Sequence, residues 1–189
     1  MLLKSVLPAA LAFLLVLPAP AAEVTVKLDP SATKISFTLD AVMHTVHGTA
    51  KAKGGEVRFD PESGAASGRV EVDAKSADTG NQGRDKDMHA KVLESAKFPE
   101  IVLELERVEG GFRAEGASSP TLQGKLTIHG GTHAVSIPAK VEVAGNKLTA
   151  HLSFKVPYVE WGMKDPSGVV LRVGKEVPVT VVAVGTISQ

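Results

Sequence analysis

Cysteine is absent from this sequence of 189 residues. The protein therefore cannot form a disulfide or carry a lipid on an amino-terminal cysteine, and its domain must be stable without cross-links. An excess of charge of one sign is absent as well, because 21 lysine and arginine residues balance 21 aspartate and glutamate residues. Proteins that bind nucleic acids present concentrated positive charge, so this composition argues against a nucleic-acid partner.

Long hydrophobic runs are also scarce, and the one present lies at the start of the chain. Lys4 precedes an apolar run over residues 6–16, and small residues follow at 19–22. This order is typical of a cleavable signal peptide. The run is shorter than a membrane-spanning helix. We therefore predict a signal peptide over residues 1–22, a mature domain over residues 23–189 without a transmembrane segment, and a periplasmic or secreted location.

Aromatic residues are few, with six phenylalanines, one tyrosine and one tryptophan, so the apolar positions are mainly aliphatic. These positions alternate with polar ones. Ile35, Phe37 and Leu39 share one face of a predicted strand, and residues 135–143 show the longest strict alternation. Alternation with a period of two is typical of half-buried β-strands. About eight to ten such runs, joined by short turns, predict an all-β antiparallel domain, either a closed barrel or a sandwich.

Residues 78–101 are the only long segment between strands that does not alternate. Within it, Met88, Val92 and Ala96 recur every four residues, a spacing that places them on one side of a helix. This helix is expected to end before Pro99, because a residue that precedes proline disfavours the helical conformation. The sequence therefore predicts one short helix in an otherwise β fold.

Several positions on the predicted inward faces carry small side chains, namely Ala74, Ala139, Ala150 and Ala183. In a barrel of about eight strands, small inward residues can leave room for one slender ligand. In the alternative interpretation, these alanines meet larger partners and the core is filled. The pattern is compatible with both.

A catalytic or metal site is not predicted. The turn at Gly130-Gly131 could bring His129 and His133 together, but two ligands fall short of the four that a closed zinc site needs. His44 and His47 lie three apart on a predicted strand, so their side chains should point to opposite faces. The motif Gly-x-Ser-x-Gly is absent, and no order of residues selects a catalytic triad. We therefore expect no enzyme activity, no cofactor and no bound metal.

The densest polar cluster is formed by Asp78, Asn81, Arg84, Asp85 and His89. In one interpretation these residues only cap the helix, form local ion pairs and face solvent. In the other, Arg84 and His89 lie at the mouth of a barrel and contact a polar head group. Both interpretations remain open at the level of the sequence.

The same segment belongs to a series of motifs that extends over nearly the whole mature chain. In order, they are Ile35-Ser36-Phe37 with His44 and Gly48, Asp78-Thr79-Gly80-Asn81, Arg84-Asp85 with His89, Lys97-Phe98-Pro99-Glu100-Ile101, and Gly124-Lys125-Leu126-Thr127-Ile128-His129-Gly130 with Thr132. Their order and spacing resemble those of the YceI-like family. The resemblance implies an eight-stranded antiparallel lipocalin-like barrel, with a helix near one end and an elongated apolar tunnel that holds a long isoprenoid or fatty chain.

The chain departs from the commoner family pattern at two places. Residues 90–94 replace a bulky, Phe-rich segment that follows the position of His89 in other members, and residues 161–166 look like one branch of the family. Both segments are expected to border the mouth of the cavity. The ligand can therefore differ from the long isoprenoids associated with better-known members.

We hypothesise a binding protein that holds a long-chain amphiphile, polyisoprenoid or fatty-acid-like, for transport, storage or sequestration. Alternation assigns the apolar lining of its cavity to Phe37, Leu39, Met43, Val72, Leu103, Leu126, Leu152 and Phe154. The candidates for polar contacts at the mouth are His44, Arg84 and His89. The alternatives are an interaction module with a filled core, which could form a homodimer, and a metal-dependent stress protein.

Overall fold

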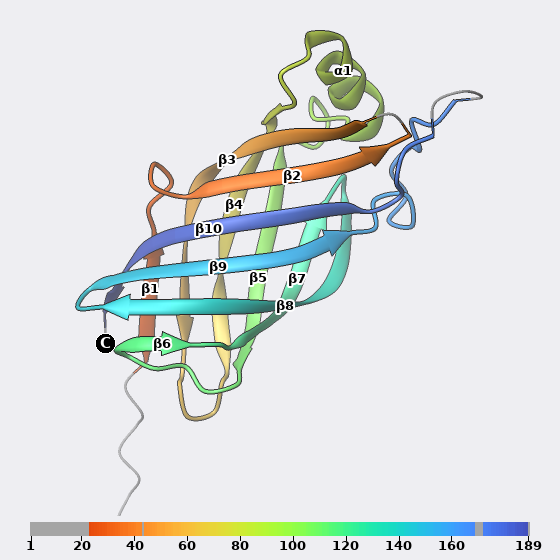
Figure 1. The fold of residues 1–189 in the computed structure, drawn as a ribbon. Coiled ribbons are helices and arrows are strands. Elements are labelled where there is room, and N and C mark those ends of the chain that lie inside the picture. Colours follow the sequence, from red (N-terminus) through yellow and green to blue (C-terminus); the bar gives the residue numbers. More distant parts are fainter. Residues whose placement is uncertain (1–22, 43, 169–171, 189) are drawn as a thin grey trace, which may run out of the picture.

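The described chain is almost entirely β-structure (Figure 1). The structure is a computed structural model that describes residues 23–42, 44–168 and 172–188. Its strands are β1 (Val24–Leu28), β2 (Lys34–Ala41), β3 (His44–Phe59), β4 (Ala66–Asp78), β5 (Glu100–Glu109), β6 (Gly116–Ser118), β7 (Thr121–Ile128), β8 (Gly131–Ala144), β9 (Lys147–Val156) and β10 (Val177–Ser188). A helix, α1 (Gln82–Asp87), continues into a π-helical turn, η1 (Met88–Val92). The predicted all-β class with one short helix is confirmed, and the predicted signal peptide lies outside the described residues.

Eight of the strands close into an antiparallel barrel. Their order around the barrel is β2, β3, β4, β5, β7, β8, β9 and β10. The ring closes where β10 pairs with β2, which aligns Val179 with Phe37 and Val181 with Ile35. A barrel was one of the two architectures that the strand pattern allowed, and this last pairing rules out the sandwich.

The two remaining strands extend the wall at the end of the barrel away from α1 (Figure 1). β3 is 16 residues long and pairs first with β2, through residues 44–50, and then with β1, through residues 56–59. In the same way, β8 pairs with β7 near its start and with β6 through residues 141–143. The strands β1 and β2 therefore share one position in the barrel, and β6 and β7 share another.

The turn between β7 and β8 is displaced by one residue from its predicted position. Ile128 pairs with Gly131, so the turn consists of His129 and Gly130, whose φ angles are 51° and 74°. A two-residue turn with positive φ at both positions matches the twist of a β-hairpin. Histidine is among the few residues other than glycine that adopt this conformation with some frequency, which is why the turn can begin at His129.

The helix is shorter than the sequence pattern predicted. Asn81 caps its start, since its side-chain oxygen accepts a hydrogen bond of 3.0 Å from the Arg84 amide. At the other end, the Leu93 amide bonds the Met88 carbonyl five residues back, and Glu94 then takes a φ of 43°. A left-handed residue stops helix propagation. The predicted helical face therefore loses Ala96, which lies exposed beyond the helix. No helix within the described ranges is long and apolar enough to cross a bilayer.

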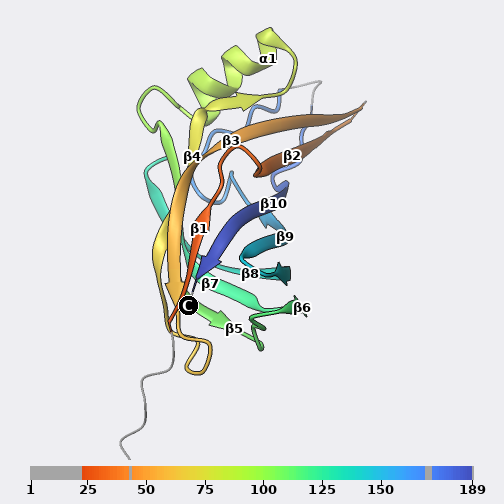
Figure 2. The same cartoon turned by 90° about the vertical axis from the view of Figure 1, so that its left-hand side faces the viewer.

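A cluster of buried apolar residues, several of which also border the interior cavity, lies toward the end of the barrel that is distant from α1. It includes Val24 and Ile137, each 1% exposed, and the ring of Phe59, which meets Phe112 edge-on at 4.8 Å between centroids. Ala139 and Ala150, both predicted to face inward, are buried in this cluster. The helix sits over the other end of the barrel (Figure 2).

Candidate ligand-binding cavity

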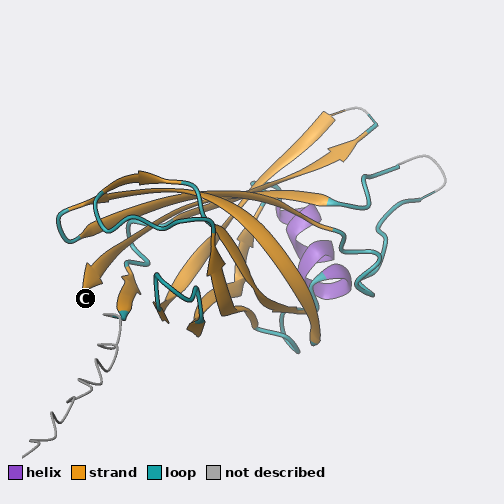
Figure 3. Ribbon diagram, turned by 90° about the horizontal axis from the view of Figure 1, so that it is seen from below, coloured by secondary structure: helices purple, strands orange, loops and turns teal. Residues whose placement is uncertain are grey.

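A cavity of about 870 Å³ lies inside the barrel. Its wall receives residues from all eight barrel strands, from β1, from the helical segment α1–η1 and from residues 163–167. We call the end bordered by these last two segments the mouth. The hairpin of β2 and β3 extends past its neighbours beside the helix (Figure 3). A cavity of this size is in the upper part of the range of about 300–1,000 Å³ that is usual for small-molecule sites.

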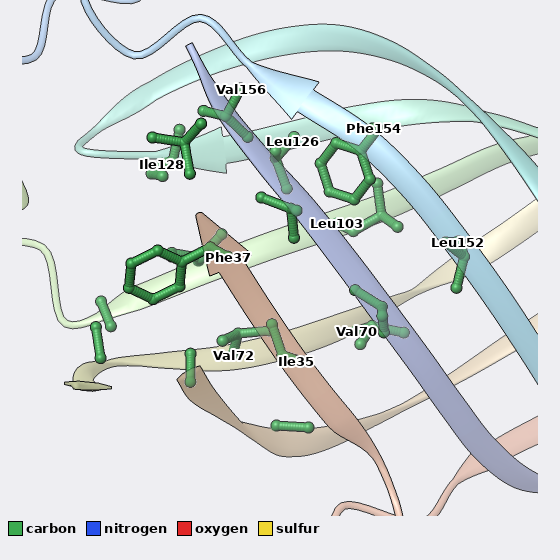
Figure 4. Close-up of a pocket in the computed structure, with 18 of the residues that line it drawn as sticks. Ile35, Phe37, Val70, Val72, Leu103, Leu126, Ile128, Leu152, Phe154 and Val156 are labelled. Carbon is green, nitrogen blue, oxygen red and sulfur yellow. The ribbon is translucent and has the colours of Figure 1, made fainter. Parts of the chain in front are cut away.

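The wall is apolar over most of its length. Side chains from β2, β4, β5, β7 and β9 point toward one another in its middle (Figure 4). They are Ile35, Phe37, Val70, Val72, Leu103, Leu126, Ile128, Leu152, Phe154 and Val156. Several of them, such as Phe37, Leu103 and Phe154, are only half-buried although they face inward. Their free faces border the cavity, where apolar surface is available to a ligand.

The ring of Phe37 lies over its partner on the next strand. Phe37 is aligned with Gly48 of β3, and a Cβ atom on Gly48 would lie 2.2 Å from the ring. The aromatic ring thus occupies the space that a side chain at position 48 would fill. A larger residue at position 48 would push the ring into the cavity.

Seven of the eight residues that alternation assigned to the apolar lining border the cavity, and Met43 lies outside the described residues. The seven are Phe37, Leu39, Val72, Leu103, Leu126, Leu152 and Phe154. The small residues Ala74, Ala150 and Ala183 border it too. Contact of these side chains with a ligand remains a prediction. The filled-core alternative predicted no such cavity, so the geometry favours the hollow barrel.

Arg84 is the predicted polar residue that borders the cavity. Its Nε donates to the Thr79 hydroxyl at 2.7 Å, and its Nη2 donates to the Thr79 carbonyl at 2.9 Å. Thr79 in turn donates its amide to the Asp85 carboxylate at 3.0 Å and its hydroxyl to the same oxygen. Burial opposes the charge on Asp85, but these hydrogen bonds hold the pKa of its carboxyl below the usual value. The guanidinium is thereby held in one orientation at the mouth.

The other two predicted polar contacts differ from Arg84. His44 begins β3, and its side chain lies outside what the structure describes. His89 is not part of the cavity wall. Its Nε2 donates to the Ala77 carbonyl and its Nδ1 bonds the Ser95 hydroxyl, both at 2.9 Å. His89 therefore attaches the helical segment to β4.

The mouth also contains residues that were not assigned individually from the sequence. Lys91, Val92 and Leu93 border it on one side, and Met163 and Lys164 border it on the other. The departure of residues 90–94 and 161–166 from the family pattern was the signal for these residues in the sequence, and Val92 also belonged to the predicted helical face. The wide turn of η1 brings Val92 and Leu93, which are adjacent in sequence, to the same wall.

Tyr158 anchors the segment that leads to the mouth. Its hydroxyl donates to the Gly174 carbonyl at 3.0 Å, and the residue is only 3% exposed. Burial, with a smaller contribution from the charge of Asp165, raises the pKa of Tyr158 to about 12. The neutral phenol is therefore the form that the fold accommodates.

The histidines of the β7–β8 turn take part in packing. His129 Nε2 lies 2.6 Å from the Glu94 carboxylate, and the ring of Phe98 contacts His129 at 4.8 Å between centroids. The ring of His133 stacks on Trp161 at 4.1 Å. Across the part of the chain that the structure describes, no group of three or more metal-ligating side chains comes together. Both histidines thus hold neighbouring segments against the hairpin.

Several solved structures resemble this barrel, including the following three. The first is BcnA of Burkholderia cenocepacia, with a TM-score of 0.68, 20% identity, and coverage of 83% of this chain and 98% of that chain. The second is a polyisoprenoid binding domain from Saccharophagus degradans, with a TM-score of 0.66, 15% identity, and coverage of 85% and 97%. The third is a YceI protein of Campylobacter jejuni, with a TM-score of 0.55, 16% identity, and coverage of 75% and 82%. At these identities the likeness establishes the fold.

Family membership rests on the sequence itself. No curated protein matches the chain. The model of one family, described as the YceI-like domain, matches residues 26–184, which span the barrel from β1 to β10. The match includes the motifs around the helix and the β7–β8 hairpin on which the resemblance was first based. The chain therefore belongs to the YceI-like domain family.

Proposed function

We propose that this protein binds one long-chain amphiphile, polyisoprenoid or fatty-acid-like, with the tail inside the barrel. The observation that carries the proposal is the cavity of about 870 Å³ with its continuous apolar wall. Protein interiors are normally packed with few voids larger than a water molecule. An apolar cavity of this size is therefore best explained as the binding site of an apolar ligand. A slender apolar chain fits both its shape and its chemistry.

The energetics favour a chain over a compact ligand. Each buried methylene contributes about 0.8 kcal/mol, so ten of them contribute roughly 8 kcal/mol. Association itself costs about 4–15 kcal/mol in lost freedom of the two molecules. Chain length would therefore dominate the affinity, and neither a reaction nor a cofactor is needed for the role.

The comparison with known structures supports the same class of ligand. The neighbour from Saccharophagus degradans is described as a polyisoprenoid binding domain, and it shares this barrel over nearly its whole length. We extend the ligand class, and not the particular molecule, to this chain. Together with the predicted signal peptide, this favours a non-catalytic carrier, store or scavenger of a lipid in the periplasm or outside the cell.

Native mass spectrometry of the mature protein, followed by organic extraction, tests the proposal. We expect one additional mass per polypeptide, which extracts as a long-chain amphiphile. If the isolated protein carries no such mass, it should acquire one on incubation with a panel of isoprenoid and fatty-chain compounds. A protein that stays empty after this incubation would contradict the proposal.

A matched pair of variants on β10 controls for binding to the outer surface. Val181 borders the cavity, whereas its neighbour Thr180 is exposed on the outside of the barrel. In Val181→Phe the added ring occupies cavity space, so the longest members of the panel should no longer bind. Thr180→Phe adds the same ring to the outer face and should bind the full panel. Equal loss, or no loss, in the two variants would place the bound lipid elsewhere.

A further inference from the structure

All charged side chains in the cavity wall, among the residues that the structure describes, lie at the mouth. Arg84, Asp87 and Lys91 come from α1 and η1, and Lys164 and Asp165 come from the segment on the other side. The strand residues whose side chains the structure describes supply only uncharged groups to the wall. A bound amphiphile therefore finds charge at one end of the cavity and none along the rest, which defines where its head group lies.

The two charged segments face each other across the mouth. The Asp87 carboxylate accepts a hydrogen bond of 2.7 Å from Lys91. This bond is the main cause that lowers the pKa of Asp87, and the charges on Lys91, Lys86 and Lys164 add to it. Lys164 belongs to the opposite segment of the mouth, which borders the same cavity as α1. A head group at the mouth would therefore be influenced by the charges of both segments.

The carboxylates at the mouth already have partners within the protein. Asp87 is paired with Lys91, and Asp165 accepts the Ser167 amide at 2.8 Å. The cations are less well compensated. Within the described chain neither Arg84 nor Lys164 has an ion pair with a carboxylate, and the contacts of the guanidinium are to the uncharged oxygens of Thr79. Asp85, which holds Thr79, is not part of the wall, although its charge and the charge of Arg84 attract each other.

We infer that the amphiphile carries an anionic head group, a carboxylate or a phosphate, which Arg84 and Lys164 bind at the mouth. The inference rests on the proposed function, since it describes the polar end of the same ligand. A hydrogen bond from a charged donor to an anion is about twice as strong as one between neutral groups. The oriented guanidinium of Arg84 suits the two oxygens of such a head group, while Lys164 supplies a mobile point charge.

A series of ligands with one tail and different heads tests the inference. Hexadecanoic acid, hexadecyl phosphate, hexadecanol and hexadecylamine are compared in competition with a fluorescent fatty-chain probe, below their critical micelle concentrations. We expect the acid and the phosphate to bind roughly tenfold more tightly than the alcohol, and the amine to bind most weakly. The two anions distinguish a carboxylate site from a phosphate site.

Removing the charge of Lys164 tests whether the preference for anionic head groups arises at the mouth. Lys164→Gln should reduce the preference for the acid over the alcohol by about three- to tenfold. Lys140, which is exposed on the outside of β8 and absent from the wall, provides the matched control, and Lys140→Gln should retain the full preference. Because exposed charges are screened by salt, the preference should also shrink as the ionic strength rises.

The outcomes separate this inference from the proposed function. If the acid and the alcohol bind equally well, or the amine binds best, the anionic head group is wrong and the lipid-binding barrel stands. If no member of the series binds, both conclusions fail. An equal loss of preference in the Lys140→Gln control would move the effect away from the mouth and overturn the assignment to Lys164.

Discussion

Tyr158 is the one tyrosine of the chain, and its buried hydroxyl is bonded to the Gly174 carbonyl. Its neighbour in the same segment, Trp161, is the one tryptophan. The absorbance of tyrosine and the fluorescence of tryptophan in this protein therefore each come from a single site beside the mouth. Few proteins of this length allow a titration to be assigned to one named side chain by absorbance alone.

The high pKa of Tyr158 has a consequence for stability at alkaline pH. In the unfolded chain the phenol loses its proton near its ordinary value of about 10, whereas in the folded protein burial raises the pKa to about 12. Between these values the folded state binds more protons than the unfolded state. The free energy of unfolding therefore falls as the pH rises through this window, by up to about 2–3 kcal/mol.

Phenolate absorbance measures this directly. We expect a midpoint near 12 for the folded protein, because burial raises the pKa of Tyr158 to about 12, and a midpoint near 10 in urea. In Tyr158→Phe the phenolate signal disappears, and the alkaline loss of stability should be smaller than in the wild-type protein. The substitution also removes the hydrogen bond to Gly174, which costs about 0.5–1.5 kcal/mol at neutral pH. A folded-state midpoint near 10 would contradict the buried, hydrogen-bonded phenol.

Among the elements, the segment from α1 to the start of β5 lies outside the strands of the barrel and is held by side-chain contacts with them. It is attached through His89 to β4 and through Glu94 to His129 in the β7–β8 turn. Glu94 and His129 are also the two non-glycine residues with positive φ in the described chain. The contact therefore joins two residues whose backbones are in a conformation that costs about 1–2 kcal/mol each.

Substitutions at Glu94 separate the contact from the strain. Glu94→Ala loses the contact with His129 and keeps the unfavourable φ, whereas Glu94→Gly loses the same contact and removes the strain. We expect urea unfolding to rank the glycine variant above the alanine variant by about 1 kcal/mol. The ion pair itself should contribute little, about 0–1 kcal/mol, because the Glu94 side chain is 42% exposed. An alanine variant as stable as the glycine variant would mean that the backbone at position 94 relaxes.

The same segment explains where the sequence pattern misled. Met88, Val92 and Ala96 have helical spacing, yet the helix ends at Val92. The five-residue bond from Leu93 to Met88, the left-handed Glu94 and the buried Ser95 depend on contacts with β4 and with the β7–β8 turn. The spacing of apolar residues within the segment contains no information about such long-range contacts. The predicted helix was therefore one turn too long.

At the level of the whole molecule, the closed barrel couples ligand binding to stability. An occupant of the cavity binds the folded state and not the unfolded one, so it raises the free energy of unfolding by about 2.7 kcal/mol at a hundred times its Kd. For a chain of this size, that corresponds to a rise in Tm of roughly 5–10 °C. We expect hexadecanoic acid to produce such a rise.

Differential scanning fluorimetry that follows Trp161 measures the effect. The wild-type protein and Thr180→Phe should show the full rise in Tm, and Val181→Phe should show a smaller one, because the ring in the cavity competes with the tail. The Tm of each protein without ligand provides the baseline for its own rise in Tm. An equal rise in all three proteins would indicate binding outside the barrel.

The sequence by itself determined which residues form strands and which of their faces points inward. Alternation placed Phe37, Leu39 and Leu103 on the inner side correctly, because the direction of a side chain in a strand repeats every two residues and needs no knowledge of the partner strand. The motifs around the helix likewise sufficed to indicate the family. Neither the volume of the interior nor the neighbours of the mouth could be obtained in this way.

Only the tertiary structure decided between a hollow and a filled barrel, since the alternation is the same in both. Closure depends on the pairing of β10 with β2, which joins residues more than a hundred positions apart, such as Thr180 and Ser36. The remaining volume depends on how side chains such as Phe37 and Gly48 fit across strands. Lys164 and Asp87 likewise border one cavity only because the fold brings together two segments that are distant in the sequence. These are properties of long-range packing, which a pattern of nearest neighbours does not contain.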